Sequence, residues 1–211
     1  MKKAILLLLL FSFVFHIKGQ YLIPGKWYKG EVVFNNKELR QGELQLDLSN
    51  NLLHFKNDSS AFIFLPSQIN HFKFYCESKK NALPRIFAPL KYANGNQSEG
   101  LVYFELLYIG KTTSLMIKGK EVNSPVYSSN PAESKPWNTE IEYDYFIQFR
   151  NGDIKKFTAL NPRVIKLLED EKEKIKSYIK SNSLNCSNFY HLVKVIEYYD
   201  QLKLKEEAIN N

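Results

Sequence analysis

"ELQLDLSNNLLHFKNDSSAFIFLP", residues 43–66, holds three short apolar stretches separated by two polar ones. In the first stretch Leu44, Leu46 and Leu48 alternate with polar residues, which is the period of two of a half-buried strand. Asn, Asp and Ser cluster in the two polar stretches and supply turns. Short strands joined by such turns predict an antiparallel meander.

The same pattern continues on both sides of this stretch. Upstream lies "GKWYKGEVVFNN", residues 25–36, and downstream lies "HFKFYC", residues 71–76. Two further hairpins are predicted around Gly110-Lys111 and Asn151-Gly152, and Asn-Gly is the strongest short hairpin signal. The polar segments 77–99 and 120–139 contain prolines and are interpreted as loops.

The hydrophobic period changes at Asn161-Pro162, where Asn161 is interpreted as an N-cap. Apolar residues then recur at helical spacing to about Lys180, and again from about Asn188 to Lys203. We expect these two helices to pack on the strands or on each other, with a coiled-coil or membrane-surface role as alternatives.

These patterns predict a mainly β (α+β) fold. We expect a curved antiparallel meander or partly closed barrel of about eight to nine strands, followed by a C-terminal two-helix hairpin. The expected organisation is a β-domain over residues 20–160, and a helical hairpin with a short polar tail over residues 161–211.

Two stretches resemble each other within the chain. "HFKNDSSAFIFLPSQI" (54–69) and "QFRNGDIKKFTALNPRVI" (148–165) both contain a strand, an Asn turn, a second strand, a Pro-bearing turn and an aliphatic residue. Two β-halves of similar design would explain this, and so would chance similarity between hairpins.

The N-terminus has the features of a secretory signal peptide. A basic start is followed by the apolar run 4–15 and by Gly19, after which we expect cleavage. The run is shorter than the roughly 20 residues of a membrane span, although an uncleaved anchor is the alternative. No Cys follows the run, which excludes a lipoprotein anchor at this point. The prediction is an exported protein, periplasmic or secreted, without a transmembrane helix in the mature chain.

The formal charge of +7 overstates how basic the mature protein is. Lys2, Lys3 and Lys18 leave with residues 1–19, and removing these three charges leaves +4. Nucleic-acid readers use clustered basic faces and arginine forks, whereas the lysines here are scattered among glutamates. We therefore expect no nucleic-acid binding.

The chain contains two cysteines, Cys76 and Cys186. In an oxidising compartment such a pair can form a disulfide, and two separate buried thiols are the alternative.

No catalytic or metal-binding motif stands out in the sequence. There is no Gly-x-Ser-x-Gly, no Walker A loop and no Gly-x-Gly-x-x-Gly. The three histidines of the mature chain have no zinc-site spacing. We predict no catalytic residues, no metal and no cofactor. Aromatic residues are in surplus, and the candidates for a ligand site or for the core are Trp27, Tyr28, Tyr103, Tyr108 and Tyr145.

Several short motifs carry a resemblance to known proteins. They are "W-x-x-G-x-V" at Trp27, "RQGELQLD", "LLHFK", "LPSQINHF", "FELLYIGKTTSLMIK", the Tyr145-Phe146 strand and the closing "IEYYD". In these features the chain resembles a group of exported β-rich proteins of the Gram-negative bacterial envelope, of unknown function. The resemblance implies an envelope setting and brings no catalytic residues.

A narrower likeness concerns Gly25, Trp27 and Tyr28, with Asp144-Tyr145 further on. These residues are similar to the opening and later motifs of lipocalins, although no arginine matches the one expected near the end of the barrel. The leading hypothesis is an exported non-enzymatic protein that binds an envelope component or a protein partner. Lipocalin-like binding of a small apolar ligand is the alternative, and an envelope-acting hydrolase is third.

Overall fold

The structure is a computed structural model that describes residues 22–75, 84–93, 99–125 and 137–210. The predicted signal peptide, residues 1–19, lies outside the described residues. Among the described residues, no helix is both long and apolar enough to cross a membrane.

Ten strands form one antiparallel sheet that is not closed. In chain order they are β1 (Tyr28–Phe34), β2 (Leu39–Asp47), β3 (Leu52–Lys56), β4 (Ala61–Phe64), β5 (Ile69–Phe74), β6 (Arg85–Tyr92), β7 (Gly100–Ile109), β8 (Thr113–Pro125), β9 (Trp137–Phe149) and β10 (Ile154–Phe157). The prediction of a mainly β, curved antiparallel fold with C-terminal helices is confirmed.

The strand order in the sheet is β10-β9-β8-β7-β6-β5-β1-β2-β3-β4. The first four strands form one meander and the last six form another. They join where β1 pairs with β5, with Val32 opposite Phe72. The two ends of the sheet are therefore β4 and β10.

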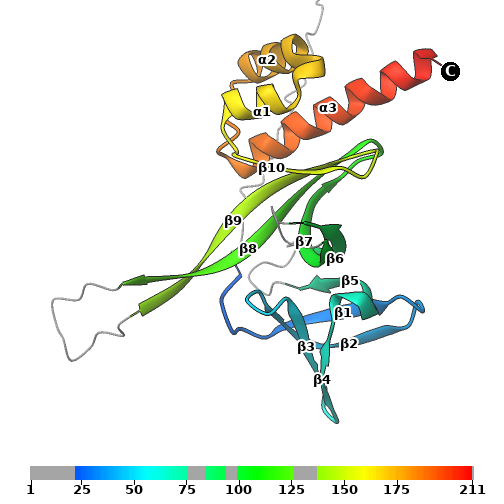
Figure 1. Cartoon of the computed structure of the whole chain (residues 1–211), viewed down its shortest axis with the longest axis vertical. Helices are drawn as coiled ribbons and strands as arrows, with labels where there is room; N and C mark the ends of the chain where they lie inside the picture. Colours follow the sequence, from blue (N-terminus) through cyan, green and yellow to red (C-terminus); the bar gives the residue numbers. More distant parts are fainter. Residues whose placement is uncertain (1–21, 76–83, 94–98, 126–136, 211) are drawn as a thin grey trace, which may run out of the picture.

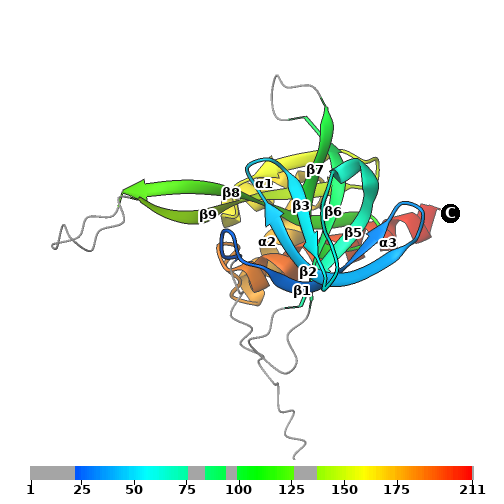
Figure 2. The same ribbon diagram turned by 90° about the horizontal axis from the view of Figure 1, so that it is seen from below.

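The segment 77–99 is not a loop throughout, because β6 occupies Arg85–Tyr92. Its prolines suggested irregular backbone, and Pro89 nevertheless lies within the strand, opposite Tyr103 of β7. The segment 120–139 is also partly regular, since β8 and β9 pair from Thr113–Phe149 as far as Pro125–Trp137. Their paired ends extend away from the rest of the sheet (Figure 1, Figure 2).

Three helices come after the sheet: α1 (Asn161–Leu167), α2 (Lys172–Ser181) and α3 (Phe189–Asn210). The single helix predicted to reach Lys180 is interrupted by a 3-10 turn, Glu169–Glu171, because Leu168 leaves helical geometry at φ −105° and ψ 42°. Leu160, not Asn161, is the N-cap. The Asn161 side chain instead donates to the Leu184 carbonyl and accepts the Cys186 N–H.

The helices cover one face of the β7–β10 region. Leu115 and Ile147 of the sheet are fully buried with apolar side chains of all three helices. The opposite face of the same strands buries Phe104, Met116 and Phe146.

The other end of the sheet has a separate aromatic core. It is built from β1–β7 side chains, with Phe55, Phe72 and Phe74 almost completely buried. Figure 1 shows the helices at one end of the molecule and the β3–β4 hairpin at the other.

Candidate functional site

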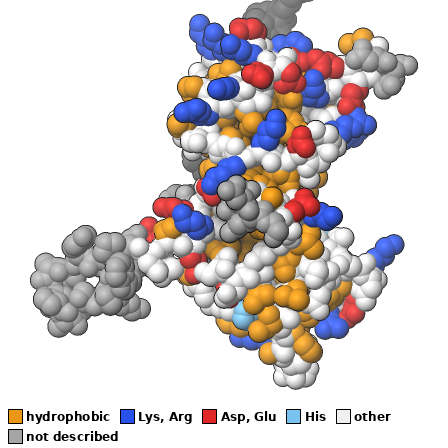
Figure 3. Space-filling view, viewed as in Figure 1, with side chains coloured by type: hydrophobic (Ala, Val, Ile, Leu, Met, Phe, Trp, Pro, Cys, Tyr) orange, Lys and Arg blue, Asp and Glu red, His pale blue; other side chains and the backbone are white. Residues whose placement is uncertain are grey.

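The edge strand β4 carries exposed apolar side chains at the end of the molecule opposite the helices. Phe62 is 43% exposed, Ile63 is 58% exposed and Leu65, directly after the strand, is 54% exposed. We refer to these three residues as the β4 edge patch. Figure 3 shows hydrophobic side chains gathered over this end of the molecule. Single exposed apolar residues are common, whereas three within four consecutive residues at a sheet edge are a candidate for binding.

Among the described residues, no strand pairs with the backbone of β4 on the side away from β3. The Asn57 N–H donates to the Ser60 carbonyl at 2.9 Å, which starts the hydrogen-bonded ladder of the hairpin. Hydrogen-bonded pairs alternate along an antiparallel ladder, so Phe62 pairs with Phe55 in this way. The N–H and C=O groups of Ala61 and Ile63 consequently point toward the free edge.

Phe62 lies on the same face of the hairpin as Phe55 and Phe64 and continues the aromatic core outward. Its ring stacks on Phe64 with centroids 5.9 Å apart, and Phe64 meets Phe34 edge-on at 4.9 Å. The Arg40 guanidinium lies over the Phe34 and Phe62 rings at 5.0 and 5.6 Å. Packing on these neighbours fixes the position of the exposed Phe62 ring.

Ile63 lies on the opposite face of the hairpin, where its partner in β3 is His54. The His54 ring meets Trp27 edge-on at 6.5 Å, and the Lys56 ammonium lies 4.5 Å from the centre of the Trp27 ring. Lys56 also forms an ion pair with Glu43 at 2.8 Å. This face of the hairpin therefore combines the apolar Ile63 side chain with aromatic rings and with charges that are neutralised in an ion pair.

The sequence did not single out the β4 edge patch, although a signal for it is present. No Lys, Arg, Asp or Glu occurs from Ser59 to Phe72. Edge strands are usually protected by charged side chains, so this uncharged run around a short strand is the sign that was available.

The predicted aromatic candidates do not form one site. Tyr28 is buried and stacks on Phe74 at 5.1 Å, and Tyr103 is buried against Phe72. Trp27, a candidate for a ligand site or for the core, is half-buried beside His54 and Lys56, and Tyr28 is the residue that points into the core. Tyr108 and Tyr145 lie at the other end of the sheet, against the helices.

The hollow beside Tyr28 is too small for a ligand. It has a volume of about 10 Å³ and is lined by residues that include Leu22, Leu46, Phe74 and Ile141. Small-molecule sites usually measure about 300–1,000 Å³. Together with the open sheet, this observation counts against lipocalin-like ligand binding. A larger but open hollow of about 430 Å³ lies between α2 and α3, beside the stacked rings of Tyr178 and Tyr198.

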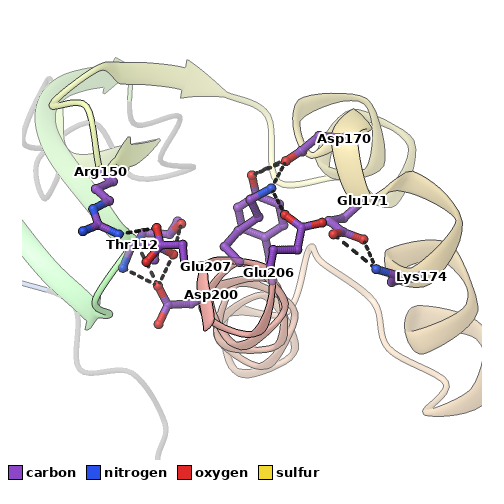
Figure 4. A network of polar contacts seen from close by, with 11 residues as sticks. Thr112, Arg150, Asp170, Glu171, Lys174, Asp200, Glu206 and Glu207 are labelled. Atoms are coloured by element: carbon purple, nitrogen blue, oxygen red, sulfur yellow. Dashed lines mark hydrogen bonds and ion pairs between the residues drawn. The ribbon is translucent and has the colours of Figure 1, made fainter. Parts of the chain in front are cut away.

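A buried carboxylate on α3 fastens the helices to the β7–β8 turn (Figure 4). Asp200 accepts hydrogen bonds from the backbone N–H groups of Lys111, Thr112 and Thr113, from the Thr112 hydroxyl at 2.6 Å and from the Tyr108 hydroxyl at 3.1 Å. Burial alone would raise the pKa of Asp200, but these donors outweigh it and lower the pKa below its usual value. Burial and Asp200 raise the pKa of Tyr108 to about 12.

A second group of charges joins α3 to the preceding 3-10 turn and α2. The Tyr199 hydroxyl donates to Asp170, and Lys203 forms ion pairs with Asp170 at 3.1 Å and with Glu206. The buried Glu171 is paired with Lys174 at 2.9 Å. Each carboxylate is engaged by a cation or a hydroxyl, so these contacts hold helices together.

The histidines are spread over separate elements. His54 lies on β3 and His71 on β5, where its Nδ1 lies 2.9 Å from the Asn70 side chain. His191 lies on α3 and accepts the Asn185 N–H at 3.0 Å. Within the described ranges, no three His, Cys, Asp or Glu side chains gather as metal ligands.

Cys186 is fully buried among the helices, and burial raises the pKa of its thiol to about 11. Cys76 lies outside the described residues. The disulfide between the two therefore stays a prediction.

Comparison with known proteins gives no match: no family model, no curated protein and no solved structure is similar to this chain.

Proposed function

We propose that this chain is an exported, non-enzymatic binding protein that takes up an extended segment of a protein partner along β4. The observation that supports this function best is the β4 edge patch beside an open strand backbone. The export signal in the sequence supports the proposed location in the periplasm or outside the cell.

Strand addition to a sheet edge is a common way to recognise an extended peptide. The bound segment gains backbone hydrogen bonds, here with Ala61 and Ile63, while its side chains contact alternate faces of the sheet. Apolar contacts are available to the bound side chains on both faces of the sheet, from Phe62 on one face and from Ile63 and Leu65 on the other. The hairpin end is already ordered, which lowers the entropic cost of binding.

The test is partner capture from envelope extracts with the wild-type protein and two variants. Ile63→Lys places a charge at the centre of the β4 edge and should abolish capture. Ile109→Lys is the matched control, because Ile109 is also a strand isoleucine and is 63% exposed, but it lies on β7. We expect the wild type and Ile109→Lys to retain the same protein, identified by mass spectrometry. Equal recovery by Ile63→Lys would refute the docking role of β4.

A further inference from the structure

We infer that the strand that pairs with the β4 edge is β4 of a second copy of this chain. This inference rests on the proposed function, because both place the bound strand along the same edge. It adds the identity of the partner, a second copy of the chain. Three observations support it: the absence of charge along the segment, the symmetry of its apolar pattern, and the protection of the other sheet edge.

The uncharged run removes the usual barrier to self-association. Identical edges repel each other when they carry charges of one sign. Residues 59–72 carry none, apart from His71 when it is protonated. Arg40 is paired with Glu38 at 2.7 Å and Lys56 with Glu43 at 2.8 Å, and the exposed Asp58 lies in the turn before β4, outside the strand that would pair. A second copy can approach without bringing unpaired like charges together at this edge.

The apolar pattern of β4 matches itself when the strand is rotated by a two-fold axis through Ile63. In this antiparallel register, Ile63 lies opposite Ile63 of the second copy, and Phe62 lies opposite Phe64. Ala61 lies opposite Leu65. Each side chain of the β4 edge patch then contacts an apolar side chain on its own face of the joined sheet: Phe62 meets Phe64 on one face, and Ile63 and Leu65 meet Ile63 and Ala61 on the other.

Backbone pairing concentrates at the two-fold axis. The outward N–H and C=O of Ile63 would exchange two hydrogen bonds with Ile63 of the second copy. Further out, the Leu65 N–H already donates to the Gln68 side chain at 2.8 Å, and the Leu65 carbonyl accepts the Gln68 N–H at 3.0 Å. The pairing is short, so we expect a weak dimer with a dissociation constant on the order of 100 µM.

Association should stop at two copies. A two-fold interface uses the same surface of both chains and leaves no second β4 free. The other sheet edge, β10, presents Lys155 and Lys156 and lacks the apolar pattern.

The experiment is sedimentation over a hundredfold range of concentration, with the full protein as purified from the cells that produce it. We expect the mass to rise from one chain toward two. Ile63→Lys should raise the dissociation constant at least tenfold, and Ile109→Lys should leave it unchanged. A wild type that remains monomeric at about 1 mM, or an Ile63→Lys variant that dimerises normally, would overturn the inference.

A charge-complementation experiment tests the register itself. I63K and I63E proteins should each be monomeric, and mixing them should restore association, because opposite charges then meet at the two-fold axis. Failure of the mixture to associate would refute pairing at Ile63. If the wild type is monomeric but captures another envelope protein in an Ile63-dependent way, the proposed function stands and self-pairing fails. If the wild type neither dimerises nor captures a protein in an Ile63-dependent way, both proposals are refuted.

Discussion

The two edges of the sheet are built alike and protected differently. β4 and β10 are both four-residue strands, and each is the second strand of a hairpin with an asparagine turn. The central residue whose backbone points outward is Ile63 in β4 and Lys156 in β10, as the ladder alternation requires. Lys156 is paired with Asp144 at 2.6 Å, whereas Ile63 is 58% exposed.

The segment after each edge strand explains the difference. After β10 the chain continues through Pro162 into α1, and three helices cover the neighbouring face of the sheet. After β4 it makes only the three-residue 3-10 turn Pro66–Gln68 before returning to β5. One end of the sheet is covered and charged, and the other is left open and apolar. This contrast is the physical basis for placing the binding role at β4.

The covered end should be destabilised by removal of the Asp200 carboxylate, which holds α3 to the β7–β8 turn. We expect Asp200→Ala to lower the free energy of unfolding by about 3–4 kcal/mol, because buried N–H and hydroxyl donors of the β7–β8 turn lose their acceptor. Urea denaturation followed by circular dichroism measures this loss. Glu207→Ala is the control, since its ion pair with Arg150 is exposed and contributes under about 1 kcal/mol. Equal losses of unfolding free energy in the two variants would show that Asp200 does not hold α3 to the β7–β8 turn.

The Asp200 carboxylate should also make the stability of the covered end sensitive to acid. The folded-state pKa of Asp200 is lowered, so its contribution to stability is complete above the unfolded pKa of about 3.9. That contribution is lost as the pH falls through the folded-state pKa. The gap in urea midpoint between wild type and Asp200→Asn should be constant from pH 7 to 5 and should narrow below about pH 4. A gap that widens in acid would show that the ionised carboxylate does not stabilise the fold.

The protected edge can be made to resemble the open one. Lys156→Ile removes the charge at the centre of β10 and leaves an apolar residue there, as in β4. We expect small amounts of species larger than a dimer in sedimentation, because each chain would then carry two apolar edges. The effect should be modest, since α1 contacts β10. Lys156→Gln is the control, and equal association of the two variants would mean that charge alone protects this edge.

Much of the pattern of strands and turns could be predicted from the sequence. The alternation of Leu44, Leu46 and Leu48 predicted a strand, and that strand is β2. The internal similarity of 54–69 and 148–165 corresponds to the hairpins β3–β4 and β9–β10, at opposite edges of one sheet. Local patterns record strands and turns well because burial on one face sets their period.

Other features depend on contacts between distant residues and were missed. β6 contains Pro89, and only its neighbours β5 and β7 make it a strand. Leu168, where the predicted helix breaks, is buried in the core between helices and sheet, and Asn161 bonds to Leu184 and Cys186, more than twenty positions away. Asp200 appears as one of many acidic residues in the sequence, and its donors are about ninety positions away. The β4 edge patch was missed because a strand's place at the edge is set by sheet order, not by its own sequence.

Removing a single hydroxyl group from each of two tyrosines on β7 allows the cores at the two ends of the sheet to be compared. The buried Tyr103 hydroxyl, in the core of the open end, has no hydrogen-bond partner among the described residues, whereas the Tyr108 hydroxyl donates to Asp200. Tyr103→Phe should therefore be neutral or stabilising by up to about 1 kcal/mol, because an unsatisfied polar group leaves the core. Tyr108→Phe should cost about 1 kcal/mol through the lost hydrogen bond. Urea midpoints of the two variants measure the difference, and a larger loss for Tyr103→Phe would show that its hydroxyl has a partner in the folded protein.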